Sequence, residues 1–153
     1  MKTVMMMILG LTSMSAMASE PTLLTYTFSN GSVAPAFHKT QTCNISATTV
    51  MITSTGPTLD FPRPINKATV YTMTIPNETV LKSLINEASQ HMTITHPAPI
   101  GGEMQRYIAP ISKDQSLVLL VLSGNLVDAQ NPSTAATELV EFMKINCTVF
   151  TIQ

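Results

Sequence analysis

The chain has 153 residues, of which 11% are charged, and its formal net charge is −1. The eight basic residues are scattered without a run, so no electrostatic feature favours binding to nucleic acid or to an acidic membrane surface. The length suits one domain with a core of its own.

Residues 1–18 have the pattern of an export signal. Lys2 supplies a short positive region, an apolar run follows, and Ala16-Met17-Ala18 is the small-x-small sequence that signal peptidase accepts. The apolar run is too short for a permanent membrane span. We therefore expect cleavage after Ala18, a periplasmic or secreted location without permanent membrane insertion, and a single mature domain over residues 19–153.

The first half of the mature chain favours β-structure. Residues 24–28 alternate between apolar and polar side chains, which is the period of a half-buried strand. Two Thr-, Ile- and Val-rich stretches follow at 37–47 and 48–54, and the first two strands fit a hairpin. After a proline-rich connection, residues 68–75 predict a further strand.

The period becomes helical after Pro76-Asn77. Asn77 is a candidate N-cap, apolar residues from Val80 to Ala88 recur at helical spacing and are expected to form the apolar face, and the helix is predicted to end near Gln90. Glu78 and Lys82 lie four residues apart and predict an ion pair on the exposed face. Residues 91–102, with two prolines and a Gly-Gly pair, predict an irregular segment.

Two strands, a helix and a last strand are expected after that segment. Residues 104–111 and 116–123 predict strands, and the continuous apolar run 117–122 indicates a central strand buried on both faces. Asn131-Pro132 predicts a helix start with Asn131 as the cap, and residues 146–152 predict a final strand. The expected fold is α+β: a mostly antiparallel sheet with two amphipathic helices packed on it.

The mature chain contains two cysteines, Cys43 and Cys147. In an oxidising compartment two cysteines without a C-x-x-C motif favour a structural disulfide over a reactive thiol. A bond between them would close a loop of 104 residues (147 − 43) and stabilise the fold by up to roughly 4–5 kcal/mol in the chain-entropy model.

No cofactor or metal is expected. Six of the eleven methionines would leave with residues 1–18, which removes the basis for copper binding through thioethers. His91 and His96 are five residues apart, which misses the i,i+4 spacing of a helical zinc site. The five remaining methionines are dispersed and predict ordinary core positions: Met51, Met73, Met92, Met104 and Met143.

The candidate catalytic residues are few and form no recognised hydrolase or nucleotide-binding motif. His38 is expected to begin a strand directly after a proline turn, where it could act as a general base. Arg106, Ser123 and Asn125 could assist it if the fold gathers them. The alternative for His38 is an ordinary strand-end histidine that bonds to the backbone.

The segment Ser32-Val33-Ala34-Pro35-Ala36-Phe37-His38, after the strand Tyr26-Thr27-Phe28, resembles the opening of a group of small exported bacterial proteins. That group has an S-x-V-P-P-x-x-H-like segment between its first strands. Gly101-Gly102 and Ser123-Gly124-Asn125-Leu126 are similar to later parts of it, whereas Ala34 replaces its second proline. The resemblance implies a bacterial exported domain, supplies no reaction, and marks these positions: Ser32, Pro35, His38, Gly101, Gly102, Ser123 and Asn125.

These observations favour a binding protein over an enzyme. The leading hypothesis is an exported domain that binds a protein or an envelope component, with a Thr/Ser-rich strand surface or a sheet edge as the contact. One alternative is an unrecognised enzyme that uses His38. The other is a protease inhibitor that presents the rigid Pro57–Pro64 loop.

Overall fold

The computed structural model describes residues 20–31, 33–34, 37–57, 65–72, 78–99, 102–111, 116–124 and 126–147. Eight strands and two helices lie within these ranges. In chain order they are β1 (Leu24–Ser29), β2 (Thr40–Ile45), β3 (Thr49–Gly56), β4 (Ile65–Thr72), α1 (Glu78–Ser89), β5 (Ile94–Pro97), β6 (Met104–Pro110), β7 (Leu117–Ser123), β8 (Val127–Gln130) and α2 (Thr134–Cys147).

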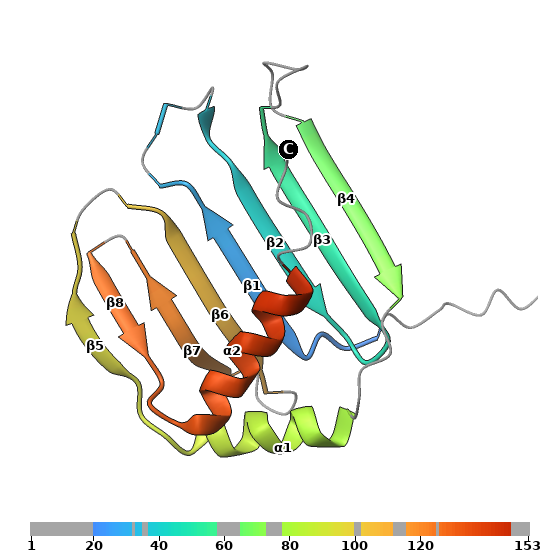
Figure 1. Cartoon of the computed structure of the whole chain (residues 1–153), viewed down its shortest axis with the longest axis vertical. Helices are drawn as coiled ribbons and strands as arrows, with labels where there is room; N and C mark the ends of the chain where they lie inside the picture. Colours follow the sequence, from blue (N-terminus) through green and yellow to red (C-terminus); the bar gives the residue numbers. More distant parts are fainter. Residues whose placement is uncertain are drawn as a thin grey trace, which may run out of the picture.

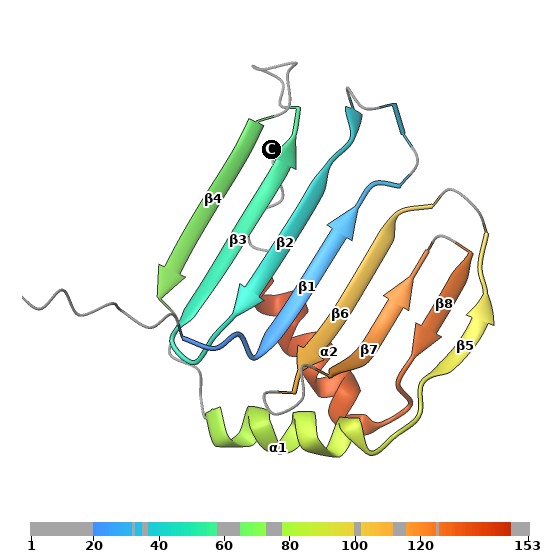
Figure 2. The same ribbon diagram turned by 180° about the vertical axis from the view of Figure 1, so that it is seen from behind.

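The strands form one sheet in the order β4-β3-β2-β1-β6-β7-β8-β5, and every neighbouring pair is antiparallel. Helix α2 crosses one face of this sheet, and α1 lies across its lower end (Figure 1). Seen from behind, the strands lie in front of α2, and α1 remains visible below their ends (Figure 2). The α+β fold with a mostly antiparallel sheet and two helices is confirmed.

The hydrophobic core lies between α2, α1 and the face of the sheet that α2 crosses. Alternate residues of the central strands point toward the helices, because side chains alternate between the two faces of a strand. Helix α1 contributes Leu81, Ile85 and Ala88 at helical spacing. The largest fully buried apolar side chains of this core are Leu24, Ile45, Val50, Ile52, Leu120, Leu139 and Met143.

The predicted disulfide is present and fastens the end of α2 to the sheet. Cys43 on β2 is bonded to Cys147 in the last turn of α2, with their Cα atoms 5.8 Å apart, and both residues are buried. The Gln41 side-chain amide also donates a hydrogen bond of 3.2 Å to the Cys147 carbonyl. The prediction that Cys147 lies on a strand is wrong, since α2 extends through it; residues 148–152 lie outside the described residues.

The cap of α2 is Ser133 and not Asn131. The Ser133 hydroxyl accepts a hydrogen bond from the Ala136 amide at 3.1 Å, as an N-cap residue does. Asn131 has a different role: its side chain is buried, donates to the Ala88 carbonyl at the end of α1, and accepts from the Ser133 amide. One amide therefore joins the two helices.

Helix α1 agrees with the sequence prediction. It ends at Ser89, one residue before the expected end, and Lys82 forms the expected ion pair with Glu78 at 2.6 Å. The predicted cap Asn77 lies outside the described residues. Val80, which was expected on the apolar face, is instead exposed.

Two short strands were not predicted. β5 lies within the segment 91–102 that was expected to be irregular, and β8 follows directly after a turn. All four residues of β5 are exposed, so no apolar alternation marks the strand, and its backbone is held by pairing with β8. The sequence predicts a loop here because the strand lies at the edge of the sheet and ends in Pro97.

The prediction that the run 117–122 is buried on both faces is wrong. β7 is the sixth of the eight strands, and only Val118 and Leu120 of this run are buried. Leu117 is 51% exposed. One face of β7 lies on the helix side and the other has no helix over it. The continuous apolar run therefore does not indicate a strand that is buried on both faces.

The methionines are mostly not in the core. Met143 is fully buried against the sheet, whereas Met51 and Met92 are exposed and Met104 is half-buried. Met73 lies outside the described residues. The prediction of ordinary core positions therefore holds for Met143 alone among the described methionines.

Candidate binding face

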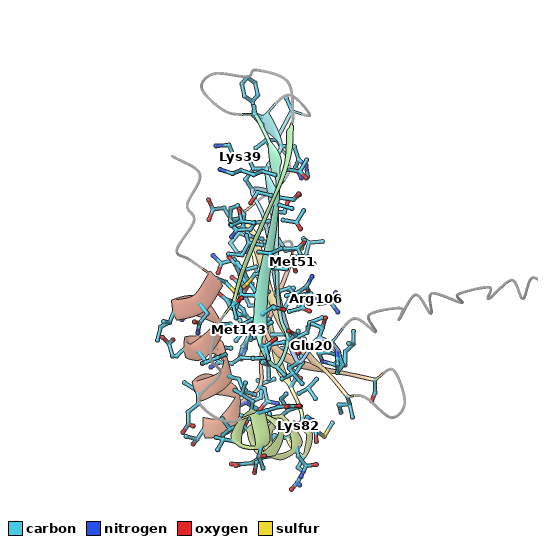
Figure 3. All side chains as sticks on the ribbon, turned by 90° about the vertical axis from the view of Figure 1, so that its right-hand side faces the viewer. Glu20, Lys39, Met51, Lys82, Arg106 and Met143 are labelled. Atoms are coloured by element: carbon cyan, nitrogen blue, oxygen red, sulfur yellow. A yellow bond between two sulfur atoms is a disulfide. The ribbon has the colours of Figure 1, made fainter. Side chains whose placement is uncertain are left out.

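The face of the sheet opposite α2 carries no helix and is named here the open face. It is formed by the outward side chains of six strands, β4, β3, β2, β1, β6 and β7, and is the near surface in Figure 2. In the edge-on view, Met51 and Arg106 lie on this side of the sheet, while Met143 lies on the side of α2 (Figure 3).

Threonine and serine hydroxyls form two aligned rows at the centre of the open face. In the first row Thr27 of β1 is opposite Thr42 of β2, which is opposite Thr53 of β3. In the second row Ser29 is opposite Thr40, which is opposite Thr55. Residues directly opposite in register share a face, so these six side chains form one array.

The spacing of this array follows from sheet geometry. Neighbouring strands lie ~4.8 Å apart, and residues two apart along a strand lie ~6.7 Å apart. All six residues are half-buried. Each hydroxyl can donate one hydrogen bond and accept others, and each threonine adds a methyl group. The Ser29 hydroxyl is already bonded to His38 and to the Gly31 amide, and the rest of the array adds regularly spaced polar and apolar groups at moderate exposure.

Toward its lower part the open face becomes more apolar. Thr25 donates a hydrogen bond of 3.0 Å to the side-chain oxygen of Asn44, so these two polar side chains bond to each other. In the same row Met51 is opposite Val70 at the edge strand, with 40% and 62% of their surfaces exposed. On the other side Thr25 is opposite Ile108 of β6.

Arg106 is the one charged residue among the described open-face side chains of these six strands. It lies on β6, opposite Thr27 on one side and Leu122 on the other, and it is exposed. Within the described part of the chain both ion pairs lie on helices, and no carboxylate lies within ion-pair distance of Arg106. Its guanidinium offers planar donors for a carboxylate or a carbonyl from outside.

Glu20 fixes the chain at the lower end of this face. Its carboxylate accepts hydrogen bonds from the Ser46 hydroxyl at 2.8 Å, and from the Thr48 amide and hydroxyl at 3.1 and 2.9 Å. The bonds from Ser46 and Thr48 hold the pKa of Glu20 below its ordinary value, because they favour the charged form. Glu20 thereby ties the segment before β1 to the β2–β3 turn.

A buried tyrosine pair lies on the opposite side, beneath α2. The rings of Tyr26 and Tyr107 have centroids 4.6 Å apart and are tilted by 34°. Burial, followed by the neighbouring Tyr107, raises the pKa of Tyr26 to about 12. The two hydroxyls stay protonated at neutral pH, and this pair is part of the core and not of an accessible site.

His38 precedes β2 by two residues and does not begin the strand as predicted. Its Nε2 lies 3.1 Å from the Ser29 hydroxyl, at the upper end of the threonine array. The Asn30 side chain fixes this turn, since it accepts from the Lys39 amide and donates to the Phe37 carbonyl, both at 2.8 Å. His38 is therefore an exposed turn histidine that bonds a side chain.

The structure separates two of the candidate catalytic residues, Arg106 and Ser123. Ser123 is opposite Gln105, on the helix side of the sheet, whereas Arg106 is on the open face. Asn125 lies outside the described residues, as do residues 58–64 of the Pro57–Pro64 loop. Among the described residues no group of three His, Cys, Asp or Glu side chains is placed to hold a metal ion.

The Gly124 position has a structural explanation. Gly124 has φ of 96°, and a Cβ atom there would clash with the Glu103 carbonyl, so the turn between β7 and β8 requires glycine. The Asp128 carboxylate accepts a hydrogen bond from the Gly124 amide at 2.8 Å. Of the other positions marked by the resemblance, Ser32, Pro35 and Gly101 lie outside the described residues.

The sequence carried a signal for the array that periodicity alone did not reveal. Three strands contain a T-x-T motif, and antiparallel pairing places five of the six motif threonines, all but Thr25, in the two central rows: Thr25-Tyr26-Thr27, Thr40-Gln41-Thr42 and Thr53-Ser54-Thr55. Repetition of this motif in three consecutive strands indicates a shared polar face.

Comparison with known proteins finds no matching family model, curated protein or solved structure. Neither described helix has the length and apolar character needed to cross a bilayer. Function is therefore inferred from the open face itself.

Proposed function

We propose that the protein is an exported, non-catalytic binding domain that docks a protein partner on its open face. Export is proposed from the signal pattern of residues 1–18, with cleavage after Ala18 and a periplasmic or secreted mature domain. A disulfide is compatible with an oxidising compartment. The observation that carries the binding role is the composition of the open face.

The composition favours a protein partner over another ligand. Protein interfaces are enriched in Met and Arg and depleted in Lys, Asp and Glu. The described open face has this balance: Met51, Met104 and Arg106 are present, and no Lys, Asp or Glu is found among the described open-face side chains of β1–β4, β6 and β7. We propose that the partner places an acidic group opposite Arg106.

The area is of the right order for such a contact. Six strands at ~4.8 Å and about six residues at ~3.3 Å give a projected area of roughly 600 Å². Stable complexes bury about 800 Å² per partner. The face is favoured over the sheet edges because Lys67 is exposed on edge strand β4 and Pro97 ends edge strand β5, and both features oppose strand addition.

Site-specific photo-cross-linking in intact cells tests the docking face. A photoreactive residue at Thr42 should give one defined cross-linked protein, and the same residue at Glu138, exposed on α2, should not. With the purified partner, Arg106→Glu should weaken binding at least tenfold, while Lys144→Glu on α2 should leave it unchanged. Equal cross-linking from both faces, or an affinity that Arg106→Glu leaves unchanged, would contradict the proposal.

Export is tested separately on the full chain. Fractionation of the source cells should recover the protein outside the cytoplasm, and N-terminal sequencing should begin at Ser19. A cytoplasmic protein that retains residues 1–18 would overturn the export proposal and leave the docking face to be judged by cross-linking alone.

A further inference from the structure

A groove of about 580 Å³ lies at the lower end of the molecule, apart from the threonine array. It is bounded by the segment before β1, by one side of α1 and by the end of β6, and its volume lies in the range of small-molecule sites, about 300–1,000 Å³. Docking of a protein on the open face does not involve this groove.

One side of the groove is apolar. Leu23 and Ile85 are buried and form part of its wall, and Pro110 and Ile111 at the end of β6 are half-buried beside them. These side chains come from three elements that are distant in sequence. Pro21 and Thr22 complete this wall, in which Thr22 supplies the one side-chain polar group, so most of the wall suits a hydrocarbon.

The polar side is supplied by α1. Lys82, Asn86 and Ser89 border the groove together with Ile85, and these four positions form a stripe along the helix. From Lys82 to Ser89 the stripe rises ~10 Å at 1.5 Å per residue. The groove is therefore elongated, and the cation lies at one end of its helical wall.

Lys82 is the one ionisable residue among those that line the groove. Its ammonium pairs with Glu78, but that pair is exposed, with 60% and 42% of the two side chains accessible, and exposed pairs of this kind are weak. An ammonium group has three donors, so Lys82 can bind an anion as well. The nearest acid of the preceding segment, Glu20, is already bonded to Ser46 and Thr48.

We propose that this groove binds a single-chain amphiphile with an anionic head group. The head group pairs with Lys82 and accepts from the Asn86 amide, and the hydrocarbon chain lies along Leu23, Ile85 and Ile111. The Ser89 hydroxyl already donates to the Asn86 carbonyl at 2.6 Å, so it presents its oxygen and not its proton to the groove. Binding is non-covalent, and charge complementarity selects an anion over a neutral chain.

A fluorescence titration with cis-parinaric acid, a long-chain carboxylate, tests the site on the mature protein. Saturable binding below the micelle concentration of the probe is expected. The neutral methyl ester should bind at least tenfold more weakly. Lys82→Glu should weaken binding of the acid at least tenfold and leave the ester unchanged. Competition by oleate and by a lysophosphatidic acid separates a carboxylate from a phosphate head.

Lys144→Glu is the matched control, because Lys144 forms a comparable exposed pair with Glu141 at 2.7 Å on the other helix. It should leave binding unchanged. Asn86→Trp should abolish binding by filling the groove from its exposed rim without altering the core. Absence of saturable binding, unchanged binding in Asn86→Trp, or equal losses in the two lysine variants would overturn the proposal.

The proposal for the groove and the proposal for the open face can be refuted independently. Arg106→Glu should leave binding of cis-parinaric acid intact, and Asn86→Trp should leave partner cross-linking at Thr42 intact. If circular dichroism shows that Asn86→Trp is unfolded, amide chemical-shift changes in the wild type decide the matter. Shifts upon addition of oleate should centre on residues 82–89 and 110–111, and shifts centred elsewhere would overturn the site.

Discussion

The two faces of the eight-stranded sheet differ in what their side chains can do. On β3, adjacent residues show the contrast: Ile52 is 2% exposed beneath the helices, while Met51 is 40% exposed on the other side. The helix side is a packed core fastened by a disulfide, whereas the open face is a half-buried array of hydroxyls beside Arg106, which has no ion-pair partner among the described residues. One sheet thus carries its packed core on one side and the proposed docking surface on the other.

Removing the disulfide is expected to have the largest effect on the helix side. The double substitution Cys43→Ala and Cys147→Ala should lower the free energy of unfolding by about 4–5 kcal/mol, because the unfolded chain loses a closed loop of 104 residues. Urea denaturation of the double variant and of the oxidised protein measures the change. A loss below ~1 kcal/mol would mean that α2 is held by packing alone.

Truncation of a leucine on each face of β7 compares the faces directly. Leu120→Ala should cost about 2–5 kcal/mol, because Leu120 is fully buried and a cavity would remain. Leu117→Ala should cost less than ~1 kcal/mol, since half of Leu117 is exposed. Denaturant unfolding of the two variants checks the difference. Equal costs would show that something covers the open face.

Two asparagines provide the next comparison. Asn131→Ala on the helix side should cost about 2–3 kcal/mol, because the Ala88 carbonyl and the Ser133 amide would lose their partner in a buried site. Asn44→Ala on the open face removes only the acceptor of Thr25, which water can replace, and should cost less than ~1 kcal/mol. Thermal unfolding of both variants distinguishes them.

Alkaline titration reports on the helix side. Neutral Tyr26 is favoured in the folded protein, where burial raises its pKa to about 12. Its contribution to stability is complete below the ordinary tyrosine pKa of about 10 and is lost as the pH rises from there toward 12. Tyr26→Phe should flatten this part of the stability curve, and absorbance of tyrosinate against pH would detect the delayed ionisation.

Acid titration reports on the lower end of the open face and should give the smallest effect. The pKa of Glu20 is lowered in the folded state by bonds from Ser46 and Thr48. Its contribution is therefore complete above the ordinary glutamate pKa and is lost as the pH falls through the lower folded value. Glu20→Gln should remove this slope from the stability curve. An unchanged acid slope would mean that other carboxylates dominate it.

Much of the fold was predictable from local patterns. Three features were predictable because they depend on side-chain type, which is given directly by the sequence. They are the alternation in residues 24–28, the helical spacing after Asn77 and the pair of cysteines. β5 and β8 were missed because their pairing is made by the backbone, and exposed residues such as Thr95 and His96 carry no burial signal.

The candidate site was only partly predictable. A Thr/Ser-rich strand surface was expected, but the sequence cannot say which face of a sheet α2 will cover, and this decides whether Leu117 is buried or exposed. The proposed grouping of His38, Arg106 and Ser123 depended on strand parity. The register of β6 and β7 places Arg106 and Ser123 on opposite faces.

The position of α2 in the chain has a consequence for biogenesis. All eight strands are synthesised before the helix that covers the centre of their core, and Cys43 emerges 104 residues ahead of the cysteine with which it pairs. Until then a nascent sheet would have both surfaces uncovered, which is the condition under which chains aggregate. In the export proposed above, the disulfide could form only after Cys147 has emerged, so the covering helix and its covalent link to the sheet would be completed late.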